Sequence, residues 1–199
     1  MDSNKGLESI GEEAFSILSQ FFKYDHDVPL DVKVYDQEDN ETSSRVKVVF
    51  HGVREGRVPA YLALLAAMTP PYPVIFLLHV LGANKGDWWT ESTDEYQVAS
   101  ELLDAGYAVC ALDIPFHGER AFQSDYESVW SVIVVHSRVN RYRDMLVESV
   151  LDHRRAIDCL TTRSDIDWKR IGIFGRSVGG LVTHVLTALI PGSKWPSPP

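Results

Sequence analysis

The 199-residue sequence has few cysteines, no long apolar run and a shortage of positive charge. Only Cys110 and Cys159 occur, each within an apolar segment, so we expect buried free thiols and not a disulfide framework. The apolar runs are shorter than the ~18 residues that a membrane-spanning helix requires. Residues 1–13 are acidic and lack the apolar core of a secretory signal. We therefore expect a soluble, cytoplasmic protein that does not bind membranes.

The charge balance argues against nucleic acid as a partner. Lys and Arg total 19 and Asp and Glu total 28, which gives a formal net charge of −9. A chain with this excess of acid offers no basic patch to neutralise phosphates. The 45% hydrophobic and 24% charged residues are typical of a globular domain with a real core. A small neutral or cationic substrate is the easiest ligand to accommodate.

The most informative stretch is residues 170–188, where an apolar run ends in the sequence GRSVGG around Ser177. A helical pattern follows at once, formed by Leu181, Val182, Val185 and Leu189. The G-x-S-x-G spacing predicts a sharp strand–turn–helix, in which glycines two residues either side of the serine avoid steric collisions. The serine hydroxyl would then stand at the positive end of a helix. Ser177 is thus a candidate nucleophile; the alternative is a purely structural glycine-rich turn.

The same residues do not fit a phosphate-binding loop. Gly175 and Gly180 match the glycine spacing of a P-loop, but Leu181 and Val182 stand where that loop needs Lys and then Ser or Thr. No G-x-G-x-x-G sequence occurs at a strand-to-helix turn, so we expect no dinucleotide cofactor. The histidines show no metal-ligand spacing such as H-E-x-x-H, and we expect no metal site.

The hydrophobic pattern divides the chain into three segments. Residues 1–27 are predicted to form an N-terminal amphipathic helix whose apolar side packs, residues 28–190 form the core domain, and residues 191–199 form a frayed Pro/Ser-rich tail. The apolar face of the first segment consists of Leu7, Ile10, Ala14, Ile17, Leu18, Phe21 and Phe22.

The hydrophobic pattern of the core domain predicts an α/β fold. Alternating apolar residues at 30–34 and 46–50, separated by a polar loop at 36–44, and a third strand at 58–65 indicate an antiparallel beginning. From residue 74 onward, continuous apolar strands alternate with helices, one of which would start with a capping box at Ser92 and Glu95. This alternation predicts a doubly wound, mainly parallel sheet.

With these segments placed, the chain resembles the α/β-hydrolase superfamily, in the branch of dienelactone hydrolases, acetyl esterases and prolyl oligopeptidases. The resemblance covers residues 28–190. It rests on GRSVGG around Ser177 and on three further sequences, HVLGANK at 79–85, DIPFHGER at 113–120 and DWKRIGIF at 167–174. It implies that Ser177 is the nucleophile and that the amides of Val178 and Leu81 form the oxyanion hole. A catalytic acid and a histidine would come later in the chain.

The chain departs from the family pattern in two places. Val80 stands where the family usually has Gly, which would misalign the oxyanion hole if that position needs a positive φ. Residues 178–199 contain no Asp or Glu, and their one histidine, His184, lies seven residues from Ser177 on the same helix, about 10.5 Å along its axis. His117 is a candidate substitute base, because its loop is expected to leave the sheet at the same edge as the serine turn. The alternative is that His117 only forms part of a structural turn.

The leading hypothesis is a serine hydrolase of carboxylic esters that uses Ser177, with its acid and histidine absent from these residues. The resemblance implies that C-terminal strands of the sheet are missing, so an apolar edge near residues 171–174 is expected to promote self-association. One alternative is a catalytically inactive α/β-hydrolase fragment or binding module, and another is a prolyl oligopeptidase-like serine peptidase. No cofactor is expected for any of them.

Overall fold

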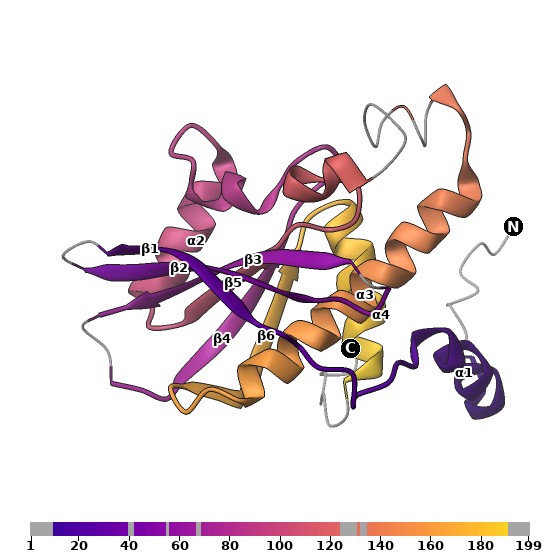
Figure 1. The fold of residues 1–199 in the computed structure, drawn as a ribbon, viewed down its shortest axis with the longest axis horizontal. Helices are drawn as coiled ribbons and strands as arrows, with labels where there is room; N and C mark the ends of the chain where they lie inside the picture. Colours follow the sequence, from indigo (N-terminus) through magenta and orange to yellow (C-terminus); the bar gives the residue numbers. More distant parts are fainter. Residues whose placement is uncertain are drawn as a thin grey trace, which may run out of the picture.

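The computed structural model describes residues 10–39, 42–54, 56–66, 69–123, 131 and 135–190. Within them a six-stranded sheet has the order β1-β2-β3-β5-β4-β6 (Figure 1). The strands are β1 (Lys33–Asp39), β2 (Ser43–His51), β3 (Arg57–Leu65), β4 (Tyr72–Leu78), β5 (Ala108–Leu112) and β6 (Ile166–Gly175). The α-helices are α1 (Glu12–Ser19), α2 (Asp94–Asp104), α3 (Val139–Thr161) and α4 (Val178–Leu189), and the 3-10 helices are η1 (Gln20–Phe22), η2 (Lys85–Trp89) and η3 (Gly118–Gln123).

The sheet is mixed, which confirms the predicted α/β fold with antiparallel N-terminal strands. β1, β2 and β3 pair antiparallel in succession, and β3 pairs antiparallel with β5. β4 lies between β5 and β6 and runs parallel to both. The carboxyl ends of β4, β5 and β6 therefore meet at one edge of the sheet, where α/β proteins place their ligand sites.

The polar loop expected at residues 36–44 is wrong in most of its length, because β1 continues to Asp39 and β2 begins at Ser43. Gln37 pairs with Val46 and Glu38 with Arg45 across the two strands. β1 is an edge strand whose residues are all exposed. Its polar side chains stay in solvent, so a polar sequence is compatible with a strand at this position.

Two apolar layers cover the faces of the sheet, with α2 on one side and α3 and α4 on the other (Figure 1). Along β4 the side chains alternate between them: Phe76 and Leu78 face the cluster that contains Val182 of α4, whereas Leu77 faces the cluster that contains Leu103 of α2. None of the helices described is both long and apolar enough to cross a membrane.

The helix α1 stands at one end of the molecule and buries none of its residues (Figure 1). Ile17 is 60% exposed and Phe21, which follows the helix, is 67% exposed. Leu7 of the predicted apolar face lies outside the described residues, and among its described members only Phe22 packs against the main core. The amphipathic pattern of this segment therefore does not translate into burial within the described residues.

The helix α2 begins differently from the predicted capping box of Ser92 and Glu95. Its N-cap is Thr93, which makes no side-chain capping bond to the helix. Glu95 instead accepts a hydrogen bond from Nη1 of Arg176 at 2.7 Å. The arginine beside Ser177 is therefore held by an ion pair between α2 and the turn after β6.

Candidate active site

Ser177 lies on a tight turn between β6, which ends at Gly175, and α4, which begins at Val178. Its backbone has φ 53° and ψ −117°, a conformation that costs a non-glycine residue of the order of 1–3 kcal/mol. The Ser177 side chain is exposed and does not cap the helix. A strained, solvent-facing serine at a helix N-terminus is typical of a nucleophile held ready for attack.

Close packing explains the two glycines that flank the serine. A Cβ on Gly175 would lie 2.3 Å from the carbonyl oxygen of Gly179 and 2.4 Å from Oγ1 of Thr183. A Cβ on Gly179 would lie 2.2 Å from the carbonyl oxygen of Leu78, at the end of β4. The G-x-S-x-G spacing thus lets α4 start directly against the ends of two strands.

Two backbone amides beside the turn are available as donors. In the part of the chain that the structure describes, no acceptor takes the N–H of Val178 or that of Leu81. Leu78 pairs with Gly175, so the loop after β4 and the turn after β6 leave the sheet side by side. The side chain of Leu81 packs against the buried cluster that contains Val178. Val178 and Leu81 therefore remain candidates for the two donors of an oxyanion hole.

Val80 causes no backbone strain in this loop. The residue in the loop with a positive φ is Gly82, at 84°, and Val80 is not among the non-glycine residues in the left-handed region. The position that needs a glycine is therefore occupied by one. The backbone strain that a positive φ would cause at Val80 is therefore absent.

His79 holds the loop through both of its ring nitrogens. Its Nε2 accepts a hydrogen bond from the amide of Ile114 at 3.3 Å, so Nδ1 carries the proton and donates to the carbonyl oxygen of Val80 at 2.9 Å. Burial lowers the pKa of His79, in agreement with a neutral imidazole. His79 therefore ties the candidate oxyanion loop to the loop after β5.

His117 is placed in the interior and has no hydrogen bond to Ser177. Its Nδ1 lies 2.8 Å from the carbonyl oxygen of Pro115, and its Nε2 is buried without a partner among the described residues. Burial lowers the pKa of His117 to about 4. His184 is exposed on α4, where Nδ1 lies 2.8 Å from the carbonyl oxygen of Gly180. Neither imidazole is placed by a hydrogen bond to act on Ser177.

A buried ion pair supports the site, and the sequence analysis missed it. Lys85 of η2 donates from Nζ to Oδ2 of Asp113 at 2.8 Å and to Oε1 of Glu119 at 2.5 Å. Asp113 also accepts the amides of Lys85 and Glu119. A Cβ on Gly118 would lie 2.4 Å from this carboxylate. The sequence did contain a signal for this pair, because Lys85 and Asp113 each follow a buried strand. The carboxyl ends of these two strands, β4 and β5, meet at one edge of the sheet.

Arg120 continues the polar network toward α3 and was also not anticipated. Its Nη1 donates to Oδ2 of Asp152 at 2.7 Å and to the carbonyl oxygen of Asp113 at 3.2 Å, and its Nη2 donates to Oε1 of Glu148 at 2.6 Å. The guanidinium is buried, and its partners lie on α3 and in the loop after β5. These bonds fix that loop against α3.

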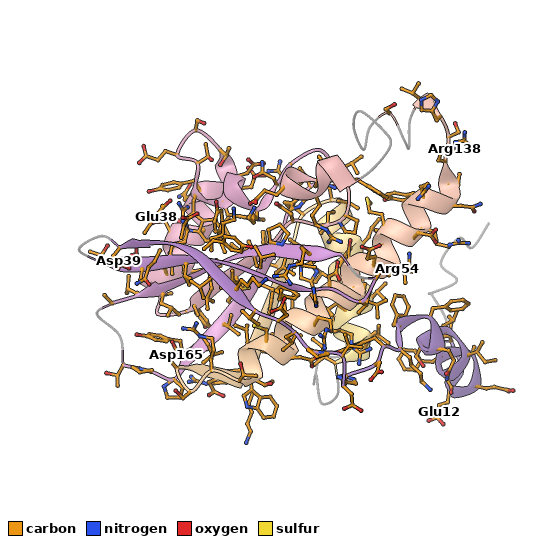
Figure 2. All side chains as sticks on the ribbon, viewed as in Figure 1. Glu12, Glu38, Asp39, Arg54, Arg138 and Asp165 are labelled. Atoms are coloured by element: carbon orange, nitrogen blue, oxygen red, sulfur yellow. The ribbon has the colours of Figure 1, made fainter. Side chains whose placement is uncertain are left out.

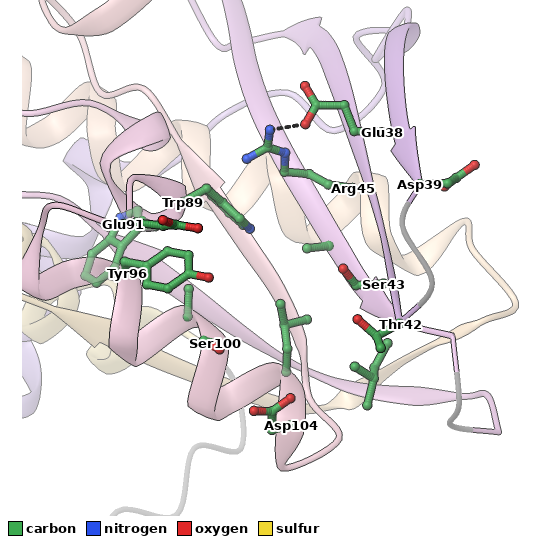
Figure 3. Close-up of a pocket in the computed structure, with 15 residues that line it drawn as sticks. Glu38, Asp39, Thr42, Ser43, Arg45, Trp89, Glu91, Tyr96, Ser100 and Asp104 are labelled. Carbon is green, nitrogen blue, oxygen red and sulfur yellow. Dashed lines mark hydrogen bonds and ion pairs between the residues drawn. The ribbon is translucent and has the colours of Figure 1, made fainter.

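A groove of about 450 Å³ lies between the β1–β2 hairpin and α2 (Figure 3). Figure 3 shows Tyr96 and Ser100 of α2 on one side and Ser43 and Arg45 of β2 on the other. Ser177 is not among the residues that line it. This groove is therefore separate from the predicted nucleophile.

The described residues provide no metal centre. No group of three or more His, Cys, Asp or Glu side chains among them is arranged to hold an ion. The buried carboxylates near the candidate site, Asp113 and Asp152, are occupied by Lys85 and Arg120.

The mixed sheet and the strand–turn–helix at Ser177 define a protein of the α/β-hydrolase class. The sequence profile of the Acetyl xylan esterase (AXE1) family matches residues 16–195. The chain belongs to this family. It is also 28% identical over 139 residues to YtaP of Bacillus subtilis (strain 168), a protein named as a hydrolase.

Solved esterases share the fold at low sequence identity. Acetyl Xylan Esterase 1 from Thermoanaerobacterium sp. JW/SL YS485 superposes with a TM-score of 0.66 and 18% identity over 94% of this chain and 57% of that protein. The acetyl xylan esterase from Paenibacillus sp. R4 gives a TM-score of 0.60 and 20% identity over 89% of this chain and 54% of that protein.

The chain spans about half of the length of these relatives. The match to YtaP covers 67% of this chain but 44% of that protein, and the match to the Thermoanaerobacterium enzyme covers 57% of the enzyme. The relatives therefore contain residues with no counterpart in the matched region.

Proposed function

We propose that the protein is a serine hydrolase of carboxylic esters with Ser177 as its nucleophile. The observation that carries the proposal is the exposed, strained Ser177 beside two amides that have no acceptor in the described chain. Membership of an esterase family supports the same reaction class. The fold alone would not, because one fold hosts many functions.

The geometry supports acyl transfer in two steps. Oγ of Ser177 forms a bond to the acyl carbonyl carbon, its proton passes to a base, and the carbonyl oxygen becomes an oxyanion. The amides of Val178 and Leu81 donate to that oxygen; loss of one such donor typically costs about 3 kcal/mol of transition-state stabilisation. The alcohol leaves with a proton returned by the base. Water then hydrolyses the acyl-serine to a carboxylic acid and free Ser177.

We infer that the general base and its acid come from residues outside these 199. Among the described residues, no histidine makes a hydrogen bond to Ser177, and His79, His117 and His153 each have a ring nitrogen at a backbone carbonyl oxygen. Burial also lowers the pKa of each of them. The relatives are about twice as long as the matched region, which leaves room for both groups.

Acetyl esters are the first substrates to test. The matching family is named for an acetyl xylan esterase, and two of the similar structures are acetyl xylan esterases. An acetyl group demands little room beside Ser177. The acyl group of the natural substrate is therefore proposed to be short.

Covalent labelling tests the proposal directly. A fluorophosphonate should label the natural full-length protein at Ser177, and Ser177→Ala should abolish both labelling and hydrolysis of 4-nitrophenyl acetate. Ser164→Ala, at an exposed serine before β6 and so at the opposite end of that strand from Ser177, is the matched control and should keep both activities. Wild-type protein that neither labels nor hydrolyses the ester would instead be an inactive member or binding module. Cleavage of a proline-containing peptide in place of the ester would favour the peptidase alternative.

A further inference from the structure

A cavity of about 580 Å³ lies at the carboxyl edge of the sheet, between the turn after β2, the loop after β5 and α3. Ligand sites commonly have this volume and this position in α/β proteins. Figure 2 places Arg54, one of its lining residues, beside α3. The charged residues that line it are Arg54, Arg57, Arg120, Arg141, Asp144 and Glu148. This concentration of arginine is unexpected in a chain with a net charge of −9.

Two of the four arginines are already neutralised. Arg57 donates to Oδ2 of Asp31 at 2.8 Å. Arg120 donates to Asp152 and Glu148, and its side chain is almost fully buried. These two guanidinium groups therefore contribute structure and little free positive charge.

The other two arginines have spare hydrogen-bonding capacity. Arg54 approaches a carboxylate only at 3.8 Å, the distance from its Nη1 to Oε2 of Glu148. Arg141 is exposed, and no carboxylate in the described chain pairs with it. The nearby Asp144 is paired with Arg143, at 2.8 Å. Within the described chain, Arg141 is thus left at the cavity without a counter-ion, and Arg54 has a single long ion pair with Glu148.

The cavity is linked to the candidate oxyanion residues through packed side chains, although Ser177, Val178 and Leu81 do not line it. Met145 lines the cavity and belongs to the buried cluster that contains Val178. Phe116 also lines the cavity and packs against the same cluster, as does Leu81. Residues that carry the two candidate oxyanion amides therefore share a packed cluster with the cavity wall.

We propose that this cavity binds a carboxylate carried by the ester substrate, with Arg54 and Arg141 as its recognition groups. The inference rests on the proposed function, since it names the substrate class of the same site. Guanidinium groups present parallel N–H donors that match a carboxylate, and their hydrogen bonds to an anion are stronger than bonds between neutral groups. The substrate is then an anionic ester, in contrast to the neutral or cationic one that the net charge favours.

Calorimetric titration of the natural full-length protein with succinate tests the inference, with dimethyl succinate and inorganic phosphate as comparison ligands. Wild-type protein should bind succinate, and the double variant Arg54→Gln/Arg141→Gln should bind it at least tenfold more weakly. Arg170→Gln, at an exposed arginine of β6 whose partner Asp167 does not line the cavity, should bind as wild type does.

Each alternative result has a definite meaning. Undiminished succinate binding in the double variant, or no binding by wild type, would overturn the inference. Phosphate binding as tight as that of succinate would overturn the assignment to a carboxylate, and equal binding of dimethyl succinate would show that charge is not recognised. Fluorophosphonate labelling of Ser177 is measured separately, so a failure of the proposed function is distinguished from a failure of the anion site.

Discussion

Lys85 and Asp113 form a buried ion pair, with Nζ and Oδ2 2.8 Å apart, although 28 positions separate them in the sequence. Lys85 follows the loop after β4 and Asp113 follows β5, so the pair joins two neighbouring strand ends. Through it, the loop that carries Leu81 is attached to the loop that carries His117. The ion pair therefore positions one of the two candidate oxyanion donors.

Lys85→Met should destabilise the protein strongly. It leaves the buried Asp113 carboxylate without its cation, and breaking a buried pair from one side typically costs about 3–5 kcal/mol. Lys47→Met is the matched control, because Lys47 pairs with Glu119, whose side chain is 46% exposed, and should cost less than about 1 kcal/mol. Urea unfolding measures both. Similar losses for the two variants would contradict the structural role of the buried pair.

Ser177→Gly should make the protein more stable than Ser177→Ala while both lack hydrolytic activity. Glycine adopts φ 53° without a side-chain penalty, whereas alanine keeps the strain, so a difference of about 1 kcal/mol is expected. Thermal unfolding compares the two variants with wild type. Equal stability of the two would show that the turn relaxes and that Ser177 is not strained.

Gly179→Ala should lower the free energy of unfolding by about 1–3 kcal/mol, because its Cβ would enter the backbone of Leu78. Gly180→Ala, the neighbouring position, meets the carbonyl oxygen of Gly175 at 3.3 Å, and alanine favours a helix by about 1 kcal/mol over glycine. The second variant should therefore be close to wild type. Denaturant midpoints that rank the two in the opposite order would argue against the close approach of α4 to β4.

Acid should destabilise the folded state from about pH 6.5 downward. Burial lowers the pKa of His117 and of His153 to about 4, so both stay neutral in the folded protein while the unfolded chain takes up protons. Their contribution to stability is present above the unfolded pKa of about 6.5, and about 1.4 kcal/mol per imidazole is lost for each pH unit between that pKa and the folded pKa of about 4. Urea midpoints at pH 7 and pH 5 measure this loss.

A histidine variant isolates this pH effect. Burial raises the pKa of Asp152 and of Glu148, which acts in the opposite direction, so the comparison is made between variants. His153→Leu should flatten the pH slope, and His184→Gln, at an exposed position, should not. An unchanged slope in His153→Leu would contradict a neutral buried imidazole.

The 199-residue chain should self-associate through β6. This strand lies at the end of the sheet order, and Trp168 and Phe174 on it are 47% and 44% exposed. An unpaired apolar edge can pair with a second chain. Sedimentation velocity should show concentration-dependent association, and Trp168→Lys should reduce it because a charge opposes edge pairing. A monomer at all concentrations would refute this prediction.

The sequence by itself determined the α/β class and the turn at Ser177. Both are encoded locally: hydrophobic period distinguishes strand from helix, and the glycines at 175 and 179 reflect steric limits within a few residues of the serine. The assignment of Leu81 as an oxyanion donor came instead from the resemblance of residues 79–85 to the family's loop, and it stays a prediction. The apolar pattern was less reliable for α1, whose side chains are exposed. An amphipathic pattern predicts a helix but does not show which surface its apolar face packs against.

Only the tertiary structure decided which charges meet. Asp113 pairs with Lys85, Arg120 with Asp152, and the arginine-lined cavity joins three elements that are distant in sequence. These contacts depend on the strand order, which places β5 between β3 and β4. Because a charge interacts with any group within a few ångströms, its partner is set by the packing of the whole sheet and not by the residues next to it in the chain.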